Sequence, residues 1–248
     1  MSAATARLIS NIGKSAFPES LLSAAGEAIT HDAAALMVLH HAAPPSVLID
    51  RLQPAERGYL YGDYLSGVYT LSPFYRAARK LKAPFIARIM DIAPRGFTQS
   101  EYYRRYFALI GVDDMIGMLI PAGYGDTVFM SFSRSSGRPR FTAPELRALE
   151  AQSHILAAAT ARHVELAGPI TEHKPLAASK PETLPANGLT LRESQVVNLM
   201  LEGHSSRAVA EALKISNETV RVHRRNIYEK LDVSSQAELF RWFLSSRA

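Results

Sequence analysis

Cysteine is absent from this sequence of 248 residues, and long apolar runs are absent as well. Without cysteine there are no disulfides, thiolate nucleophiles, iron–sulfur clusters or cysteine-ligated zinc sites. Apolar stretches such as 33–39 and 155–161 fall far short of the roughly 20 residues that a membrane-spanning helix needs. The first residues lack the unbroken apolar block of a secretory signal. We therefore expect a cytoplasmic protein with no membrane partner.

Several catalytic and regulatory signatures are also missing. Before residue 168 there is no acidic cluster with a partner lysine, as a phosphorylated receiver domain requires, and the sequence holds neither G-x-x-x-x-G-K-[ST] nor G-x-S-x-G. The pairs His31-Asp32 and His40-His41 do not indicate a metal site, because adjacent residues of a strand point to opposite faces. We expect no enzyme, no cofactor and no metal.

What the sequence does have is an ordinary globular composition, with 47% hydrophobic and 21% charged residues. Its length suits a larger and a smaller domain. Residues 169–187 contain four prolines and no apolar periodicity, which predicts a linker between domain 1–168 and domain 188–248. The net charge of +5 favours polyanionic partners.

The first domain mixes the periodicities of helices and strands, with its clearest hairpin at 115–121 and 127–133. In the second of these strands Val128, Met130 and Phe132 share one face. The pattern predicts an α+β fold, an antiparallel sheet flanked by helices. The further expected strands are 34–40, 47–52 and 85–92, and the expected helices are 17–30, 55–68, 74–81, 102–109 and 143–166.

The pattern of the last sixty or so residues predicts four short helices, and each helix has its own boundary signal. Thr190 with Glu193 forms a capping box and Gly203 ends that helix. Ser205, Ser216 and Ser235 are the expected N-caps of the next three helices.

Two short helices joined by a tight turn, the second carrying basic residues outside, have the geometry that enters a DNA major groove. If Val220 and Ile227 pack inward, then Arg221, Val222 and Arg225 project outward and meet base edges. We expect these side chains to hold phosphates: Lys214, Asn217, Thr219, His223 and Arg224.

This tail resembles the LuxR-type helix-turn-helix family through L-T-x-R-E at 189–193, I-S-x-x-T-V-x-V-H at 215–223 and K-L-x-V at 230–233. The resemblance implies a compact four-helix domain that binds operator DNA, commonly as a homodimer, and RNA polymerase is a further expected partner. Gln236 and Val209 depart from the usual family residues. The implied dimer contacts lie on the last helix at Ala237, Leu239, Phe240 and Phe243.

Aromatic residues concentrate in the middle of the first domain and favour a small-molecule pocket, although single rings among them also suit plain core. Residues 64–73 are faintly similar to acyl-homoserine-lactone-binding domains, with Ser72 in place of aspartate and without their tryptophan; a GAF- or PAS-like domain is the other comparison. The candidate ligand-binding residues are Tyr61, Tyr64, Tyr69, Phe74, Arg76, Arg88 and Asp91.

Together these patterns predict a sequence-specific transcription regulator controlled by a small-molecule effector. One alternative is a constitutive regulator whose first domain only oligomerises. Others are an enzyme with a DNA-binding appendage, for which no catalytic groups are found, and a sigma factor, against which the lack of a second basic and aromatic helical domain argues.

Overall fold

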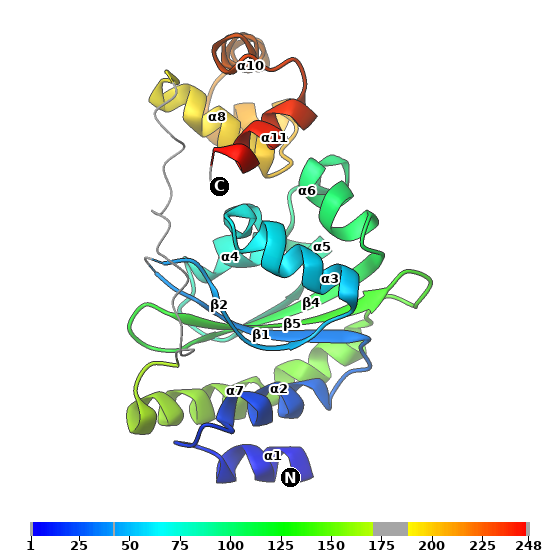
Figure 1. Ribbon diagram of the computed structural model, residues 1–248, viewed down its shortest axis with the longest axis vertical. Helices are drawn as coiled ribbons and strands as arrows, with labels where there is room; N and C mark the ends of the chain where they lie inside the picture. The colour runs from blue at the N-terminus through cyan, green and yellow to red at the C-terminus, as the bar shows by residue number, and fades with distance from the viewer. Residues whose placement is uncertain (1, 42, 171–187, 247–248) are drawn as a thin grey trace.

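The computed structural model describes residues 2–41, 43–170 and 188–246. A five-stranded sheet lies between two layers of helices, and a C-terminal helical cluster sits beyond one of these layers (Figure 1). Of the predicted linker 169–187, residues 171–187 lie outside the described residues, so the domain boundaries stay a prediction.

The sheet is antiparallel throughout, in the order β2-β1-β5-β4-β3. The predicted hairpin is its centre, and it turns at Gly123, Tyr124 and Gly125, all with positive φ. Met130 and Phe132 lie with Val128 in one core cluster, as predicted. The strands are β1 (Ala33–Leu39), β2 (Ser46–Arg51), β3 (Phe85–Arg88), β4 (Val112–Pro121) and β5 (Thr127–Ser135).

One face of the sheet is covered by α2 (Phe17–Gly26) and α7 (Ala143–Ala167), and α1 (Ala3–Ser10) packs on the outer side of α2 (Figure 1). The helix α7 begins after Thr142, whose capping box with Glu145 confirms the predicted start. No helix among the described residues is long and apolar enough to span a bilayer.

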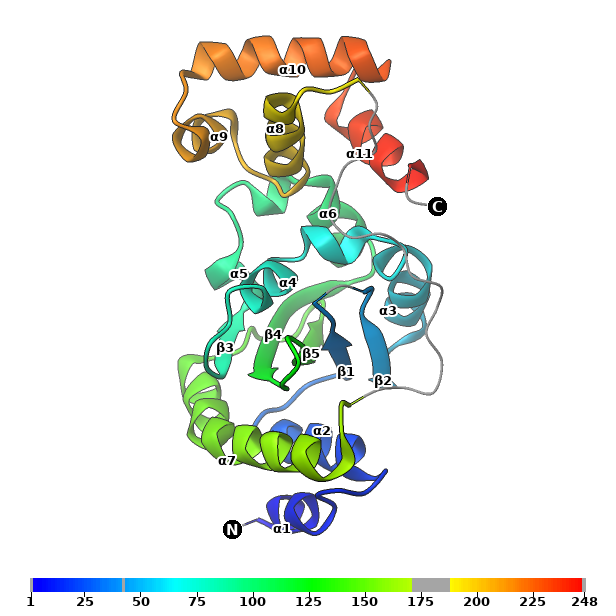
Figure 2. The same ribbon diagram turned by 90° about the vertical axis from the view of Figure 1, so that its left-hand side faces the viewer.

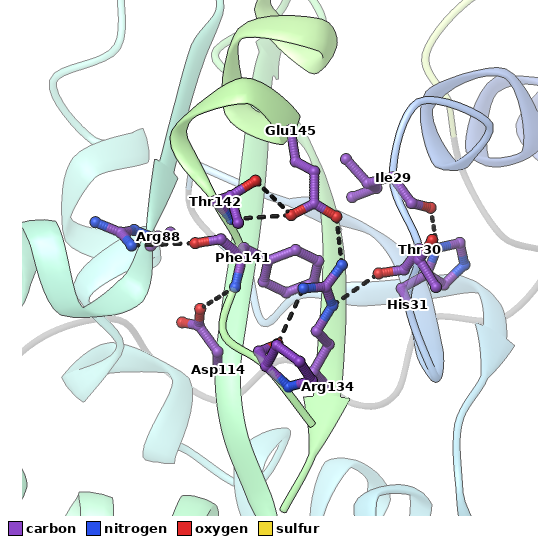
Figure 3. A network of polar contacts seen from close by, with 10 residues as sticks. Ile29, Thr30, His31, Arg88, Asp114, Arg134, Phe141, Thr142 and Glu145 are labelled. Carbon is purple, nitrogen blue, oxygen red and sulfur yellow. Dashed lines mark hydrogen bonds and ion pairs between the residues drawn. The ribbon is translucent and has the colours of Figure 1, made fainter. Parts of the chain in front are cut away.

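A buried arginine fastens the start of α7 to the sheet (Figure 3). The guanidinium of Arg134, on β5, donates to the carbonyls of Thr30 and Pro139 at 2.9 and 3.0 Å, and it pairs with Glu145. It also lies 4.0 Å from the ring centre of Phe141. Because each of its three guanidinium nitrogens has a partner, we assign this arginine a structural role.

The other face carries short helices and irregular turns. The prediction of one helix over 55–68 is wrong in its second half, since α3 passes into a π-helical segment and then a 3₁₀ turn. The predicted strand 85–92 ends at Arg88, where pairing with β4 stops. The elements are α3 (Pro54–Tyr59), η1 (Leu60–Tyr64), η2 (Val68–Leu71), α4 (Pro73–Ala78), α5 (Ile89–Ile92), η3 (Phe97–Gln99), α6 (Glu101–Tyr103) and η4 (Arg104–Ala108).

The C-terminal cluster has the four helices that the sequence predicts. Each N-cap side chain, from Thr190, Ser205, Ser216 and Ser235, accepts a hydrogen bond from a backbone N–H of the first turn. The helices are α8 (Leu191–Leu201), α9 (Ser206–Leu213), α10 (Asn217–Leu231) and α11 (Gln236–Ser245). The fold is therefore α+β with a C-terminal helix-turn-helix, as predicted.

This cluster packs on the short helices above the sheet (Figure 2). The turn between α8 and α9 lies on η3, where the backbone of Gly203 comes close to Gly96. Arg76 of α4 pairs with Glu202 at 2.9 Å. Aromatic side chains of the two parts therefore join in one continuous apolar cluster, which includes Tyr106 and Phe240.

Candidate functional site

The helix α10 lies on the side of the cluster that points away from the sheet (Figure 2), and its exposed residues include Arg221 and Arg225. Val220 and Ile227 are fully buried, so the opposite side of the helix is open. Arg221 and Arg225 have side chains that are 74% and 72% exposed, and Val222 is 43% exposed. All three predicted base-contacting residues therefore lie on accessible surface.

Among the residues that the structure describes, the ion-pair partners of these two arginines lie on their own helix. Arg221 lies 3.2 Å from Glu218, and Arg225 lies 3.9 Å from Glu229. Exposed pairs of this kind contribute about 0 to 1 kcal/mol, so either guanidinium can exchange its carboxylate for a base edge or a phosphate at little cost.

The predicted phosphate-contacting residues divide into two groups. Lys214 and Asn217 are exposed, whereas Thr219, His223 and Arg224 are partly buried. The hydroxyls of Thr219 and the N-cap Ser216 share a hydrogen bond of 2.8 Å. Together with the positive end of the α10 dipole, these groups provide backbone and side-chain donors at one place.

Arg224 has a second role that the sequence did not indicate. Its guanidinium donates to Ser206 of α9 at 3.0 Å and to the hydroxyl of Tyr228 at 3.3 Å. It therefore links α10 to α9 within the helix-turn-helix.

A capping network holds α8 against α10. Lys230 donates to the carboxylate of Glu193 at 2.7 Å, and that carboxylate also accepts from the backbone and hydroxyl of Thr190. Burial acts to raise the pKa of Glu193, but the hydrogen bonds from Lys230 and Thr190 outweigh it and leave that pKa below its usual range.

Three of the four expected dimer-contact residues on α11 are buried in this arrangement. Leu239, Phe240 and Phe243 are each at most 1% exposed, and Ala237 is partly exposed. Part of this burial comes from the first domain, because α11 packs near α6 and the guanidinium of Arg105 lies 5.6 Å from the ring centre of Phe240. Dimer contact through these side chains stays a prediction.

A cavity of about 70 Å³ opens between the sheet and the short helices above it. Its walls are mainly apolar and aromatic, with Met37 and Phe129 from the sheet, Phe74 from α4 and Phe107 from η4. Two of the contributing segments, η1 and η4, are π-helical, a geometry that is frequent at functional sites.

Polar groups of the cavity wall gather around tyrosine hydroxyls. Those of Tyr59 and Tyr64 are buried without an aligned hydrogen-bond partner among the described residues, although Tyr102 and Ser72 lie near enough to influence them. Burial raises the pKa of Tyr59, Tyr64 and Tyr102 above the usual tyrosine range. These phenols therefore stay protonated and are ready to donate to a ligand.

Of the predicted ligand-binding residues, Tyr64 and Phe74 line this cavity. Tyr69 is buried core that packs edge-on against Tyr64 and Tyr75. Tyr61 is half exposed and donates to Asp50 at 2.7 Å.

The predicted polar anchors lie elsewhere. Arg88 forms a two-bond pair with Asp91 at 3.0 Å on the surface, and it also donates to the carbonyl of Phe141. Arg76 pairs with Glu202 between the two parts of the chain. Arg88, Asp91 and Arg76 are not part of the described cavity wall, and each of them forms an ion pair outside it.

Sequence reasoning did not select Glu56, Tyr59, Tyr106 or Ser131, which all line the cavity. The signal available for Ser131 was the period of two in β5, which points this side chain to the face of the sheet opposite that of Met130. That is the face on which the cavity lies. For Glu56 the capping-box spacing after Gln53 was the signal.

One side chain of the cavity wall also touches the C-terminal helical cluster. Tyr106 lines the cavity, and its ring centre lies 6.2 Å from that of Phe240 on α11. Its hydroxyl donates to Asp63 at 3.0 Å, next to the cavity-lining Tyr64. A side chain that moves when the shape of the cavity changes is therefore in direct contact with α11.

Comparisons with known proteins agree with the description of the C-terminal cluster and with that of the first domain. Residues 187–243 match the model of the luxR family of bacterial regulatory proteins. The chain is 29% identical over 161 residues, 61% of its length and 82% of the relative's, to the "Putative HTH-type transcriptional regulator in exeN 3'region" of Aeromonas salmonicida. It is 44% identical over 55 residues to the uncharacterized response regulatory protein YgeK of Escherichia coli, covering 22% of this chain and 37% of that protein.

The first domain has a fold that is already known. The crystal structure of the VqsR LBD domain from Pseudomonas aeruginosa superposes with a TM-score of 0.54 at 21% identity, over 66% of this chain and 95% of that one. Identity at this level establishes the fold alone. The chain thus has a C-terminal helical domain that matches the luxR family of bacterial regulatory proteins, preceded by an N-terminal domain with the fold of the VqsR LBD domain.

Proposed function

We propose that this chain is a sequence-specific transcription regulator whose DNA binding is controlled by a small molecule held in the cavity of the first domain. The observation that carries the proposal is the double role of Tyr106, which lines the cavity and contacts Phe240 of the DNA-binding cluster.

In this proposal α10 is the reading helix. Arg221 and Arg225 bond guanine edges with their planar forks, and Val222 between them contacts a thymine methyl. Lys214, Asn217, Thr219, His223 and Arg224 hold phosphates, which position the domain without choosing the sequence. The exposed face of α10 and its weak ion pairs support this division.

The regulator acts as a homodimer, with two α10 helices in major grooves about one helical turn apart. Because the first domain packs on the α8–α9 turn and on α11, the arrangement of each DNA-binding domain depends on this packing. A ligand that binds one arrangement more tightly than another shifts their populations, and with them the affinity for the paired half-sites. RNA polymerase as a partner and a cytoplasmic location remain expectations.

The test begins with an operator. Duplexes that the full chain selects from a random library provide the operator sequence. The dissociation constant of the complex between the chain and this operator is then measured with and without a library of small metabolites. We expect at least one compound to change that constant about tenfold or more. In Ala35→Leu, which fills the cavity from the fully buried Ala35 of β1, this response is lost, whereas Ala151→Leu on the exposed side of α7 retains it.

A response that survives Ala35→Leu would place control outside the cavity. The absence of any response, with tight operator binding by the untreated chain, would favour the constitutive alternative, in which the first domain only oligomerises.

A further inference from the structure

The cavity contains one charged side chain, and it is acidic. Among the described residues of its wall there is no lysine, arginine or histidine, while Glu56 is 8% exposed. The Glu56 carboxylate accepts from the hydroxyl of Ser133 at 2.5 Å and from the backbone of Gln53 at 3.0 Å. No basic side chain described in the structure lies within ion-pair distance of it, so this buried carboxylate lacks a cation.

A buried carboxylate without a cation is a costly arrangement, which a bound positive group relieves. The rest of the wall supplies what an organic cation prefers. The rings of Tyr59, Tyr64, Phe74 and Tyr102 line the same space, and aromatic faces attract ammonium groups, most strongly where water is excluded.

The same wall disfavours other classes of ligand. A carboxylate or phosphate would meet no positive side chain there and would be repelled by Glu56. An uncharged ligand could use the phenolic donors, but it would leave the Glu56 carboxylate without a counter-charge.

We propose that the cavity binds a compact organic amine in its ammonium form, with the charged nitrogen at Glu56 and the apolar part against the aromatic rings. The inference rests on the proposed function, in that it names the chemical class of the ligand for the same cavity.

The test uses three probes with one apolar body, namely n-butylamine, 1-butanol and butyrate, at equal millimolar concentrations and neutral pH. Binding to the full chain is followed by thermal shift and by ligand-observed NMR. We expect the amine to bind at least about tenfold more tightly than the alcohol, and butyrate not to bind.

The variant Glu56→Gln removes the charge but preserves the local structure, because glutamine also completes a capping box: its oxygen accepts from the Gln53 N–H while its amide donates to the Ser133 hydroxyl. In this variant the affinity for the amine should fall to that for the alcohol. The affinity for the alcohol should stay unchanged, and this unchanged value shows that the cavity is intact. Glu165→Gln, which removes an equal charge from the exposed surface of α7, should leave all three affinities unchanged.

Equal affinity for amine and alcohol in the unmodified chain overturns the inference, whether or not the variant folds, and so does a preference for the amine that survives Glu56→Gln. Failure of all three probes to bind also overturns it. None of these results decides the proposed function, which is tested separately by the metabolite response of Ala35→Leu.

Discussion

At the scale of single residues, a close backbone approach joins the two halves of the chain. A side-chain carbon added at Gly96 would lie closer than 3.0 Å to the carbonyl oxygen of Gly203, on the turn between α8 and α9. The backbone at Gly96 has φ of −89°, which any residue adopts. The absence of a side chain at this position therefore serves the contact between the two parts rather than the local conformation.

This contact makes Gly96→Ala a selective variant. We expect it to separate the DNA-binding domain from the first domain while each keeps its own fold. Small-angle scattering should then show a larger radius of gyration, and the backbone NMR signals of the α8–α9 turn should shift.

Gly58→Ala is the matched control, because a side-chain carbon there meets no atom within 4 Å. An unchanged radius of gyration in Gly96→Ala, or the same expansion in Gly58→Ala, would show that this contact does not hold the two parts together.

The neighbouring arginines of α10 should differ in their effect on DNA recognition. Arg225→Ala should cost about 1 to 3 kcal/mol of binding free energy and relax the preference at one base position, because its guanidinium is free to bond a base edge. Arg224→Ala should weaken binding to all duplexes alike, since we propose that this side chain contacts phosphate and it also hydrogen-bonds Ser206 of α9.

Binding-site selection with both variants measures this difference. A loss of base preference in Arg224→Ala together with an unchanged sequence profile in Arg225→Ala would reverse the assignment of the two side chains.

At the scale of elements, the capping boxes couple helix stability to pH. The pKa of Glu193 lies below its ordinary value of 4.5 in the folded chain, so this group stabilises the fold above about pH 4.5 and its contribution is lost as the pH falls through the lower folded value. Glu193→Gln should lower the free energy of unfolding at neutral pH by about 1 kcal/mol and weaken its fall in acid.

Urea titrations at several pH values measure this effect, with the fluorescence of Trp242 as the probe, because the single tryptophan of the sequence lies on α11. Glu218→Gln on the exposed face of α10 serves as the control. A parallel pH dependence in Glu193→Gln and the unmodified chain would show that the capping network does not contribute.

The helices of the C-terminal domain were predictable because their signals are local. Thr190, Ser205, Ser216 and Ser235 each cap the next few residues, and the periodicity of Val220 and Ile227 already separates the inner from the outer face of α10. The same holds for α7 and for the central hairpin, whose patterns are long and regular.

The short elements above the sheet were not predictable in this way. The passage of α3 into the π-helical η1, and of α6 into η4, depends on tertiary packing around the cavity rather than on any local signal. The cavity wall was therefore recovered at Tyr64 and Phe74 but missed at Glu56 and Ser131, which lie near these rings only after the chain has folded.

At the scale of the whole molecule, the proposed ligand control requires that a change in the cavity alters the position of α10, the proposed reading helix. The cavity is lined by the short helices on the face of the sheet toward which the C-terminal cluster lies (Figure 1). In the proposed function, the two are coupled through the contact of Tyr106 with Phe240 and the close approach at Gly96. The layer of α1, α2 and α7 lies on the opposite face of the sheet.

The most direct test is the operator affinity of the full chain with and without an effector from the metabolite library, measured in parallel on the unmodified chain and on Gly96→Ala. We predict that the effector changes the dissociation constant of the unmodified chain about tenfold or more and that of Gly96→Ala by less than about twofold. An equal change in both proteins would contradict control through the contact between the two domains.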